Sequence, residues 1–305
     1  AVEQLHSSVV RSNPNDECES PSLPRNDFHI VLGGYQESGE AGLNKTDNYL
    51  LDLGLTNADI FWYRRIHEEQ PLLSSIQGPC GVNVHERLLL PNYGRDGSAF
   101  YDHVLEVYHR PPRAIVFLHG HGAVAWHTSC EAVFARTAYF YRDLAAGPQQ
   151  LATPAAPRVR DHMMTLTSDC TGTKDFELSW FGHPPSNRTL DDIYACKGHK
   201  RRRLQEPPEV EVCEAFLHRW NVTKYNRHPY QTCCASFILP GERIQRYPRA
   251  FWEDLQNVMT DLRQPDKSRS CWEFIIYDIL GDERDQFHSD DLRNFYAEAD
   301  GHVHG

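Results

Sequence analysis

The chain has 305 residues, of which 40% are hydrophobic and 24% are charged, and its formal net charge is -11. This composition is typical of a globular protein with enough length for a sizeable core. The acidic charge argues against nucleic acid as a partner, because phosphate binding needs a concentrated positive surface. No stretch approaches the roughly 18 consecutive apolar residues of a membrane span, so we expect no span in this chain.

Sequons and cysteines indicate an oxidising, luminal compartment. Glycosylation sequons begin at Asn44, Asn187 and Asn221, and nine cysteines occur without any C-x-x-C pair. The odd count leaves at least one cysteine outside any intrachain disulfide. Because the chain begins at Ala1, we interpret it as a mature or trimmed chain, which is compatible with the removal of an N-terminal anchor. The expected location is the secretory lumen, the cell surface or the extracellular space.

The first hundred residues contain a polar lead-in followed by short strands. Residues 1–26 are polar and proline-containing, which predicts an extended segment. Apolar runs bounded by turn residues then predict three strands, at 28–32 (closed by Gly33-Gly34), at 58–63 and at 87–90 (ended by Pro91).

A helix, a buried strand and a second helix follow. Apolar residues at helical spacing predict a helix over 100–108 that stops near Pro111-Pro112. The unbroken apolar run 115–118 is typical of a strand in a sheet covered on both faces. Thr128 and Glu131 have the spacing of a capping box, which predicts the start of a helix continuing to Leu144.

The middle of the chain is irregular and the last third is regular. The proline-rich and alanine-rich composition of residues 147–160 predicts a connector between the halves, and the irregular polar pattern of residues 163–208 predicts long loops. Later patterns predict a helix at 213–220, a strand at 233–239, a helix from a first-turn Pro248 to 262, and a helix at 272–280 with Gly281 as its C-cap.

The alternation of strands and helices predicts an α/β fold with a mainly parallel central sheet flanked by helices. We expect one domain over 27–285, with halves at about 27–146 and 160–285, and a C-terminal helix and tail at 286–305.

Four ordered blocks carry a resemblance to a known family. They are LPNYGRDGSAFYDHVLEVY, IVFLHGHGAVAWH, CCASFILPGERIQRYPRAFWEDL and CWEFIIYDILG, and HIVLGGYQE precedes them. The series resembles the domain of unknown function family 3431, which is common in fungi. The resemblance spans about residues 28–281 and departs most over 150–210. It implies an architecture, since the family has no known activity.

The same order of strands and turns is similar to that of nucleotide-sugar glycosyltransferases of the GT-A type. In those folds the apolar strand ends in Asp-x-Asp, which holds a divalent metal against a sugar diphosphate. His119-Gly120-His121 stands at the equivalent place here. Two carboxylates suit Mn²⁺, whereas two imidazoles suit Zn²⁺, copper or nickel better. The cofactor expected from the resemblance is therefore a divalent metal, Mn or Zn.

Three histidines are the candidate metal ligands. His119 and His121 share one face of a regular strand, and His127 follows six residues later. Three imidazoles with an open position suit a catalytic metal. The alternatives are direct contact with substrate, or structural hydrogen bonds at a strand end and a helix start.

Several further polar residues are candidates for the same crevice. Arg95, in a glycine turn before a helix, can clamp a phosphate or carboxylate, and Glu37 and Asp96 can act as general bases. Ligands gather at the carboxyl ends of strands in α/β sheets. The remaining candidates for substrate contact are Asn92, Trp126 and Glu273.

Each of these residues also has a structural interpretation. Arg95 can pair with Asp96 or Glu37, and Glu37 can be a solvated loop carboxylate. Glu273, in an apolar helix, needs a partner such as Arg243 or a substrate hydroxyl. The adjacent pair Cys233-Cys234 favours a structural role over a nucleophilic one.

The sequence leaves three functions open. The first is a glycosyltransferase-like enzyme acting on a nucleotide sugar and a glycan or glycoprotein acceptor. The second is a non-enzymatic extracellular structural or glycan-binding protein. The third is a transition-metal-dependent enzyme that uses the histidine cluster. The sequence lacks the usual motifs of serine hydrolases, NTPases, dinucleotide enzymes and common metalloproteases.

Overall fold

The structure is a computed structural model of the full chain. It describes residues 23–35, 55–65, 76–77, 81–88, 95–119, 130–146, 163–165, 215–222, 236–261, 276 and 279–281.

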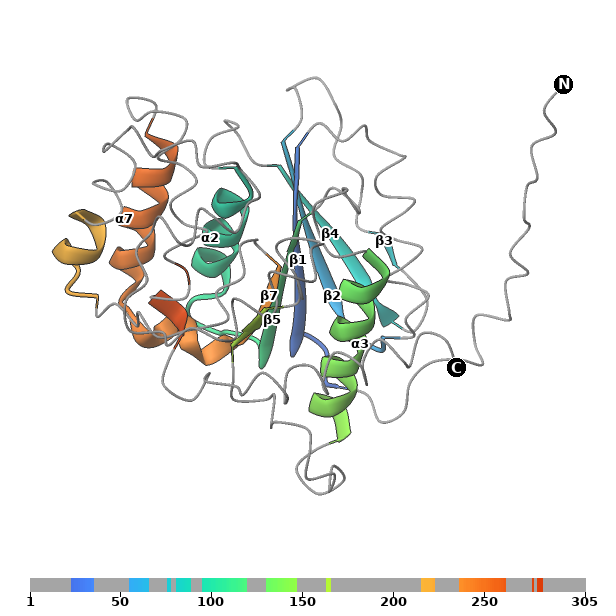
Figure 1. The fold of residues 1–305 in the computed structure, drawn as a ribbon. Helices are drawn as coiled ribbons and strands as arrows, with labels where there is room; N and C mark the ends of the chain where they lie inside the picture. The colour runs from blue at the N-terminus through green and yellow to red at the C-terminus, as the bar shows by residue number, and fades with distance from the viewer. Residues whose placement is uncertain are drawn as a thin grey trace, which may run out of the picture.

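Within these residues, seven strands form one mixed sheet in the spatial order β3-β4-β2-β1-β5-β7-β6 (Figure 1). Their bounds are β1 Phe28–Tyr35, β2 Asp59–Arg65, β3 Ile76–Gln77, β4 Asn83–Leu88, β5 Ala114–His119, β6 Met164–Thr165 and β7 Phe237–Pro240. The four strands β4, β2, β1 and β5 are parallel, and β3, β7 and β6 each pair antiparallel. The predicted α/β class and the mainly parallel central sheet are confirmed.

Helices cover both faces of this sheet. The helices are α2 Arg95–Val107, α3 Cys130–Ala146 and α7 Arg249–Thr260, and the 3-10 helix η4 Gly241–Arg246 precedes α7. Helices α2 and α7 lie side by side over one face and α3 lies over the other (Figure 1).

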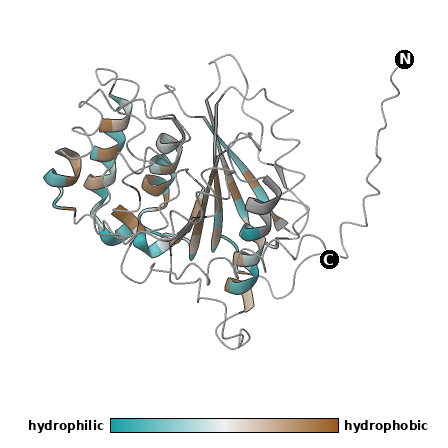
Figure 2. Cartoon of the chain, in the orientation of Figure 1, coloured by the Kyte–Doolittle hydropathy of each residue, from teal (hydrophilic) through white to brown (hydrophobic). Residues whose placement is uncertain are grey.

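Strand alternation divides the core into two layers. In β5, Ile115 and Phe117 face α2 and α7, whereas Val116 and Leu118 face α3. All four side chains are buried, which confirms the prediction of a strand covered on both faces. Figure 2 shows the apolar residues along the central strands and on the helix sides beside them.

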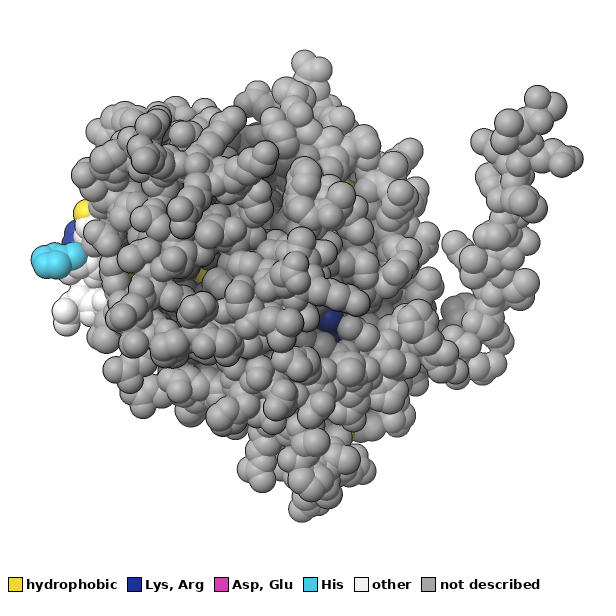
Figure 3. Space-filling view, viewed as in Figure 1, with side chains coloured by type: hydrophobic (Ala, Val, Ile, Leu, Met, Phe, Trp, Pro, Cys, Tyr) yellow, Lys and Arg dark blue, Asp and Glu magenta, His cyan; other side chains and the backbone are white. Residues whose placement is uncertain are grey.

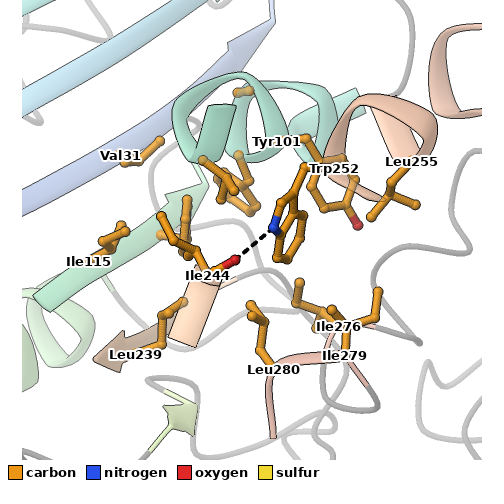
Figure 4. Packing of buried hydrophobic residues seen from close by; sticks show 14 of the residues in the cluster. Val31, Tyr101, Ile115, Leu239, Ile244, Trp252, Leu255, Ile276, Ile279 and Leu280 are labelled. Atoms are coloured by element: carbon orange, nitrogen blue, oxygen red, sulfur yellow. Dashed lines mark hydrogen bonds between the residues drawn. The ribbon is translucent and has the colours of Figure 1, made fainter. Parts of the chain in front are cut away.

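Trp252 of α7 lies at the centre of the larger core layer (Figure 4). Its ring is fully buried and packs near Tyr101 of α2, and its Nε1 donates a hydrogen bond to the carbonyl of Ile244, at 2.8 Å. The partner satisfies the indole N–H, as a buried tryptophan requires. This layer joins α7, η4 and α2 to the sheet.

Several predicted boundaries are wrong. Gly33-Gly34 does not end the first strand, because β1 continues to Tyr35 in register with β2. The third predicted strand, 87–90, is β4 and begins earlier, at Asn83. Pro248 is the N-cap of α7 and not its first helical residue.

Two further differences lie in the second half of the chain. Residues 164–165, predicted within a loop region, form the edge strand β6. Arg243 donates a hydrogen bond from its Nη1 to the carbonyl of Leu280, at 3.0 Å, so it binds the main chain near Gly281. Glu273, its expected partner, lies outside the described residues, as do 1–22, 286–305 and the Cys233-Cys234 pair.

Candidate functional site

The parallel strands finish together at one edge of the sheet. β1 ends at Tyr35, β2 at Arg65, β4 at Leu88 and β5 at His119. In the β1–β5 pairing, Gly33 stands opposite His119. The chain segments that follow β1 and β5 therefore leave the sheet from neighbouring strands.

The order of the parallel strands reverses at β1. The chain places β2 and then β4 on one side of β1, and returns to place β5 on its other side. In open α/β sheets, such a reversal opens a crevice at the carboxyl ends of the two central strands. The reversal here lies between β1 and β5.

Helix α2 begins near this same edge. Phe100 packs on Phe117, late in β5, whereas His103 packs on His29, at the start of β1. The helix therefore runs antiparallel to the strands, and its first residue, Arg95, lies toward their carboxyl ends. Main-chain N–H groups at such a helix start are suited to an anion.

The structure brings the backbones of three predicted site residues to this edge. Arg95 and Asp96 form the first turn of α2, and His119 is the last residue of β5. Their side chains lie outside the described part of the molecule, and so do all of Glu37, Asn92, His121, Trp126, His127 and Glu273. Within the described ranges, no three or more His, Cys, Asp or Glu side chains are grouped to hold a metal ion.

A polar network, which sequence reasoning missed, lies between α2 and strands β1, β2 and β4; its two histidines and Tyr63 are buried, and its ion pair of Arg87 with Glu106 is partly exposed. His29 Nδ1 lies 3.1 Å from His103 Nε2, and His103 Nδ1 lies 3.2 Å from the hydroxyl of Tyr63. The Tyr63 hydroxyl donates to Glu106, at 3.0 Å, and Arg87 donates to both carboxylate oxygens of Glu106, at 2.8 and 3.3 Å. We call these five residues the α2 polar network.

Asp59 is the second buried polar centre on this face. One of its oxygens accepts from His85, at 2.8 Å, and from Asn83, at 3.2 Å, and the other accepts from the backbone N–H of Asn26, at 3.2 Å. The Phe61 ring separates the two centres, since it stacks on His85 and lies against His29. Asp59 thus ties β2 to β4 and to the segment before β1.

Burial sets the protonation of the two histidines of the α2 polar network, and the hydrogen bond from Arg87 sets that of Glu106. Burial lowers the pKa of His29 to about 4, against a smaller opposing effect of Asp59, and lowers that of His103 well below its ordinary value. Burial also raises the pKa of Tyr63. Burial alone would raise the pKa of Glu106, but the hydrogen bond from Arg87 lowers it below the ordinary value. Both imidazoles are therefore neutral and Glu106 is ionised at neutral pH.

The signal for this network was present in the sequence but ambiguous. His29 stands inside the apolar run Phe28–Leu32, and His103 lies within the apolar face of the predicted helix. A histidine in either setting is usually a core residue whose ring nitrogens form hydrogen bonds within the protein. Only the pairing of β1 with β2 and the packing of α2 bring these side chains together.

Asn221 is the one predicted glycosylation residue within the described ranges. It is exposed and has a φ of 50°, at the end of the helix at 215–219. Its N–H donates to the carbonyl of His218, at 3.0 Å. Figure 3 shows exposed polar side chains, a histidine among them, where this helix lies in Figure 1. Asparagine therefore suits this position both as a helix end and as an accessible sequon.

Substitutions at Asn221 are expected to separate these two roles. N221G keeps a residue that favours positive φ, so its free energy of unfolding should stay within about 0.5 kcal/mol of wild type, whereas N221Q should lose about 1 kcal/mol. Chain made in a secretory host should lose one glycan in either variant, as measured by mass spectrometry before and after glycan removal. An unchanged glycan mass in N221G would show that Asn221 carries none.

No helix among the described residues is long and apolar enough to cross a membrane. No protein-family model, curated protein or solved structure matches the chain.

Proposed function

We propose that this chain is a glycosyltransferase-like enzyme of GT-A-like layering. It binds a nucleotide sugar at the carboxyl ends of its parallel strands and transfers the sugar to a glycan or glycoprotein acceptor. The expected location is the secretory lumen, the cell surface or the extracellular space.

The reversal of strand order between β1 and β5 is the observation that carries the proposal. Nucleotides bind doubly wound sheets at this kind of reversal. Glu37 follows β1 by two residues and His121 follows β5 by two residues. The sequence therefore supplies polar side chains to both sides of the crevice that the topology predicts.

The position of α2 supports a diphosphate at this edge. Arg95 opens the helix, so its guanidinium and the first N–H groups of α2 are suited to the negative charge of a diphosphate. In the proposed arrangement His119 and His121 hold phosphate or a divalent metal, with His127 as a third ligand. Asn92, Trp126 and Glu273 are the proposed contacts to the sugars.

The proposed reaction is a displacement at the anomeric carbon of the donor. The acceptor hydroxyl oxygen forms the new glycosidic bond, the bond from the anomeric carbon to the diphosphate breaks, and the nucleoside diphosphate leaves with the electron pair. Glu37 or Asp96 accepts the proton of the hydroxyl. Arg95 stabilises the charge that develops on the diphosphate.

Thermal unfolding with a panel of nucleotide sugars tests this function. A donor at 100 times its dissociation constant should stabilise the fold by about 2.7 kcal/mol, which raises Tm. The panel is run without metal, with Mn²⁺ and with Zn²⁺. R95A should abolish the shift, whereas R110A, an exposed arginine after α2, should retain it.

Two outcomes would contradict the proposal. No Tm shift with any donor under any metal condition would favour the non-enzymatic structural or glycan-binding protein. A bound transition metal without nucleotide binding would favour metal-dependent chemistry at the histidines. Elemental analysis separates these two, since a tight metal site retains about one equivalent after purification.

A further inference from the structure

The hydrogen bonds of the α2 polar network have only one consistent direction. An ionised carboxylate only accepts, so the Tyr63 hydroxyl donates to Glu106 and its oxygen is left to accept from His103 Nδ1. A neutral His103 with its proton on Nδ1 has a bare Nε2, which accepts from His29 Nδ1. The contacts thus fix the tautomers of both histidines.

In this arrangement, one ring nitrogen of the pair has no hydrogen-bond partner among the described residues. His29 Nε2 carries no proton, is buried, and has no hydrogen-bond partner in the described part of the chain. The His29 side chain is 5% exposed and His103 is fully buried. A proton taken up by the pair can bind at His29 Nε2 and creates a buried cation.

Neither neighbouring carboxylate contacts the pair as a counter-ion. Both oxygens of Asp59 accept hydrogen bonds from other groups, and Glu106 already binds Arg87 and Tyr63. A buried charge without such a partner is strongly unfavourable. The folded chain therefore resists protonation that the unfolded chain accepts.

We propose that the His29–His103 pair is an acid-sensitive attachment of α2 to the sheet, so that α2 loosens from β1 and β2 as the pH falls below neutral. The pair links the start of β1 to the helix by a hydrogen bond. A proton on His29 Nε2 leaves this bond in place but puts a buried charge without a hydrogen-bond partner between the two elements, and a proton on His103 Nε2 removes the acceptor of the bond. The proposal concerns the fold alone and holds whether or not the chain is a glycosyltransferase.

Other charged and titratable groups around the pair set the strength of the effect. Those within the described residues that face it are Asp59 and Tyr63 on β2, His85 and Arg87 on β4, and Glu106 on α2. Arg87 and His85 oppose a positive charge on His103, whereas Asp59 and Glu106 favour one on His29. Burial outweighs them for both rings.

The sign of the pH dependence follows from linkage. The pKa of His29 is about 4 in the folded chain and 6.5 as its ordinary value, so the unfolded chain binds more protons between these values. The contribution of His29 to the free energy of unfolding is therefore fully present above pH 6.5 and is lost as the pH falls toward 4. Between pH 7 and pH 5 the folding equilibrium constant should fall about 20-fold for His29, with a further contribution from His103.

The carboxylates act at lower pH. The pKa values of Asp59 and Glu106 lie below their ordinary values of 3.8 and 4.5, so their stabilising effect is lost mainly as the pH falls through and below those values. A comparison of pH 7 with pH 5 therefore separates the effect of the histidine pair from that of these two carboxylates.

Urea unfolding of the full chain at pH 7 and pH 5 tests the proposal. The double variant H29L/H103L removes both rings and leaves no half-satisfied partner between them, so it should fold. For this variant, the folding equilibrium constant at pH 7 divided by that at pH 5 should be at least about 20-fold smaller than the same ratio for wild type. H109N, at an exposed histidine just beyond α2, should keep the wild-type ratio. If the double variant fails to fold, H29N keeps a donor to His103 and removes the titrating ring of His29.

Amide hydrogen exchange locates the effect. Exchange rates are corrected for intrinsic rates. In wild type, protection should fall between pH 7 and pH 5 at residues 95–107 and should be retained at residues 249–260. In H29L/H103L, protection should be retained at both segments. An unchanged pH ratio in H29L/H103L, or in H29N where that variant replaces it, would overturn the proposal. So would equal losses of protection at α2 and α7, because they would indicate global unfolding and not release of α2.

Discussion

Replacing Trp252 by alanine is expected to lower the free energy of unfolding by about 3 to 5 kcal/mol. The indole is fully buried among α7, η4 and α2, and its N–H satisfies the buried carbonyl of Ile244. W252A therefore leaves a cavity and an unsatisfied acceptor in one step. Because small proteins are stable by about 5 to 15 kcal/mol, this loss is a large share of the total. Urea unfolding followed by circular dichroism measures it.

Two variants on the same helix sharpen this test. W252F keeps most of the ring volume and removes only the N–H, so it should lose about 1 to 3 kcal/mol, less than W252A. E253A, at an exposed residue beside Trp252, should change stability by less than about 0.5 kcal/mol. A loss below 1 kcal/mol in W252A would contradict the position of this side chain in the core.

Replacing Gly241 by alanine is expected to cost about 3 kcal/mol, although it adds one methyl group. A Cβ at this position would lie 1.8 Å from the carbonyl oxygen of Pro112, so backbone must move. Gly241 also donates its N–H to the carbonyl of Arg113, at 3.0 Å, where β7 ends beside the start of β5. The substitution therefore forces apart the β5–β7 junction, and the expected result is a lower urea midpoint.

The neighbouring substitution E242A is the matched control, because Glu242 is exposed on η4. It should leave the midpoint within the error of the measurement. Wild-type stability in G241A would show that β7 and β5 do not approach as closely as the structure places them.

The sequence was most informative where a pattern repeats locally. The unbroken apolar run at 115–118 became β5, buried on both faces, and the helical spacing from Phe100 onward became α2. The apolar stripe from Phe251 to Met259 became α7. Each pattern reports which side chains must leave water, and this requirement acts within one element.

Local rules failed where neighbouring strands decided the outcome. Gly33-Gly34 have weak strand preference, yet β2 pairs with both residues and β5 pairs with Gly33, so β1 continues through them. The edge strand β6 also exists only by pairing with β7. Hydrogen bonds between strands distant in sequence override the preference of single residues.

The candidate site also contains residues that could be chosen from the sequence and residues that could not. The polar residues that follow the strands, Glu37, Arg95 and His119, could be chosen from the sequence, because each stands just after an apolar strand or at the turn that follows one. Their convergence remains a prediction, since their side chains lie outside the described residues. The α2 polar network could not be chosen, because each of its members comes from a separate element or turn of helix.

The amino-acid sequence by itself determined the α/β class, the two-sided burial of β5 and the helices that cover the sheet. Hydrophobic periodicity is a property of neighbouring residues, so it can be seen without the fold. The tertiary structure alone decided the strand order, its reversal between β1 and β5, and the meeting of His29 with His103. These depend on contacts between residues that lie from tens of positions to more than a hundred positions apart, as in the pairing of Phe117 with Phe237, and no local pattern encodes their geometry.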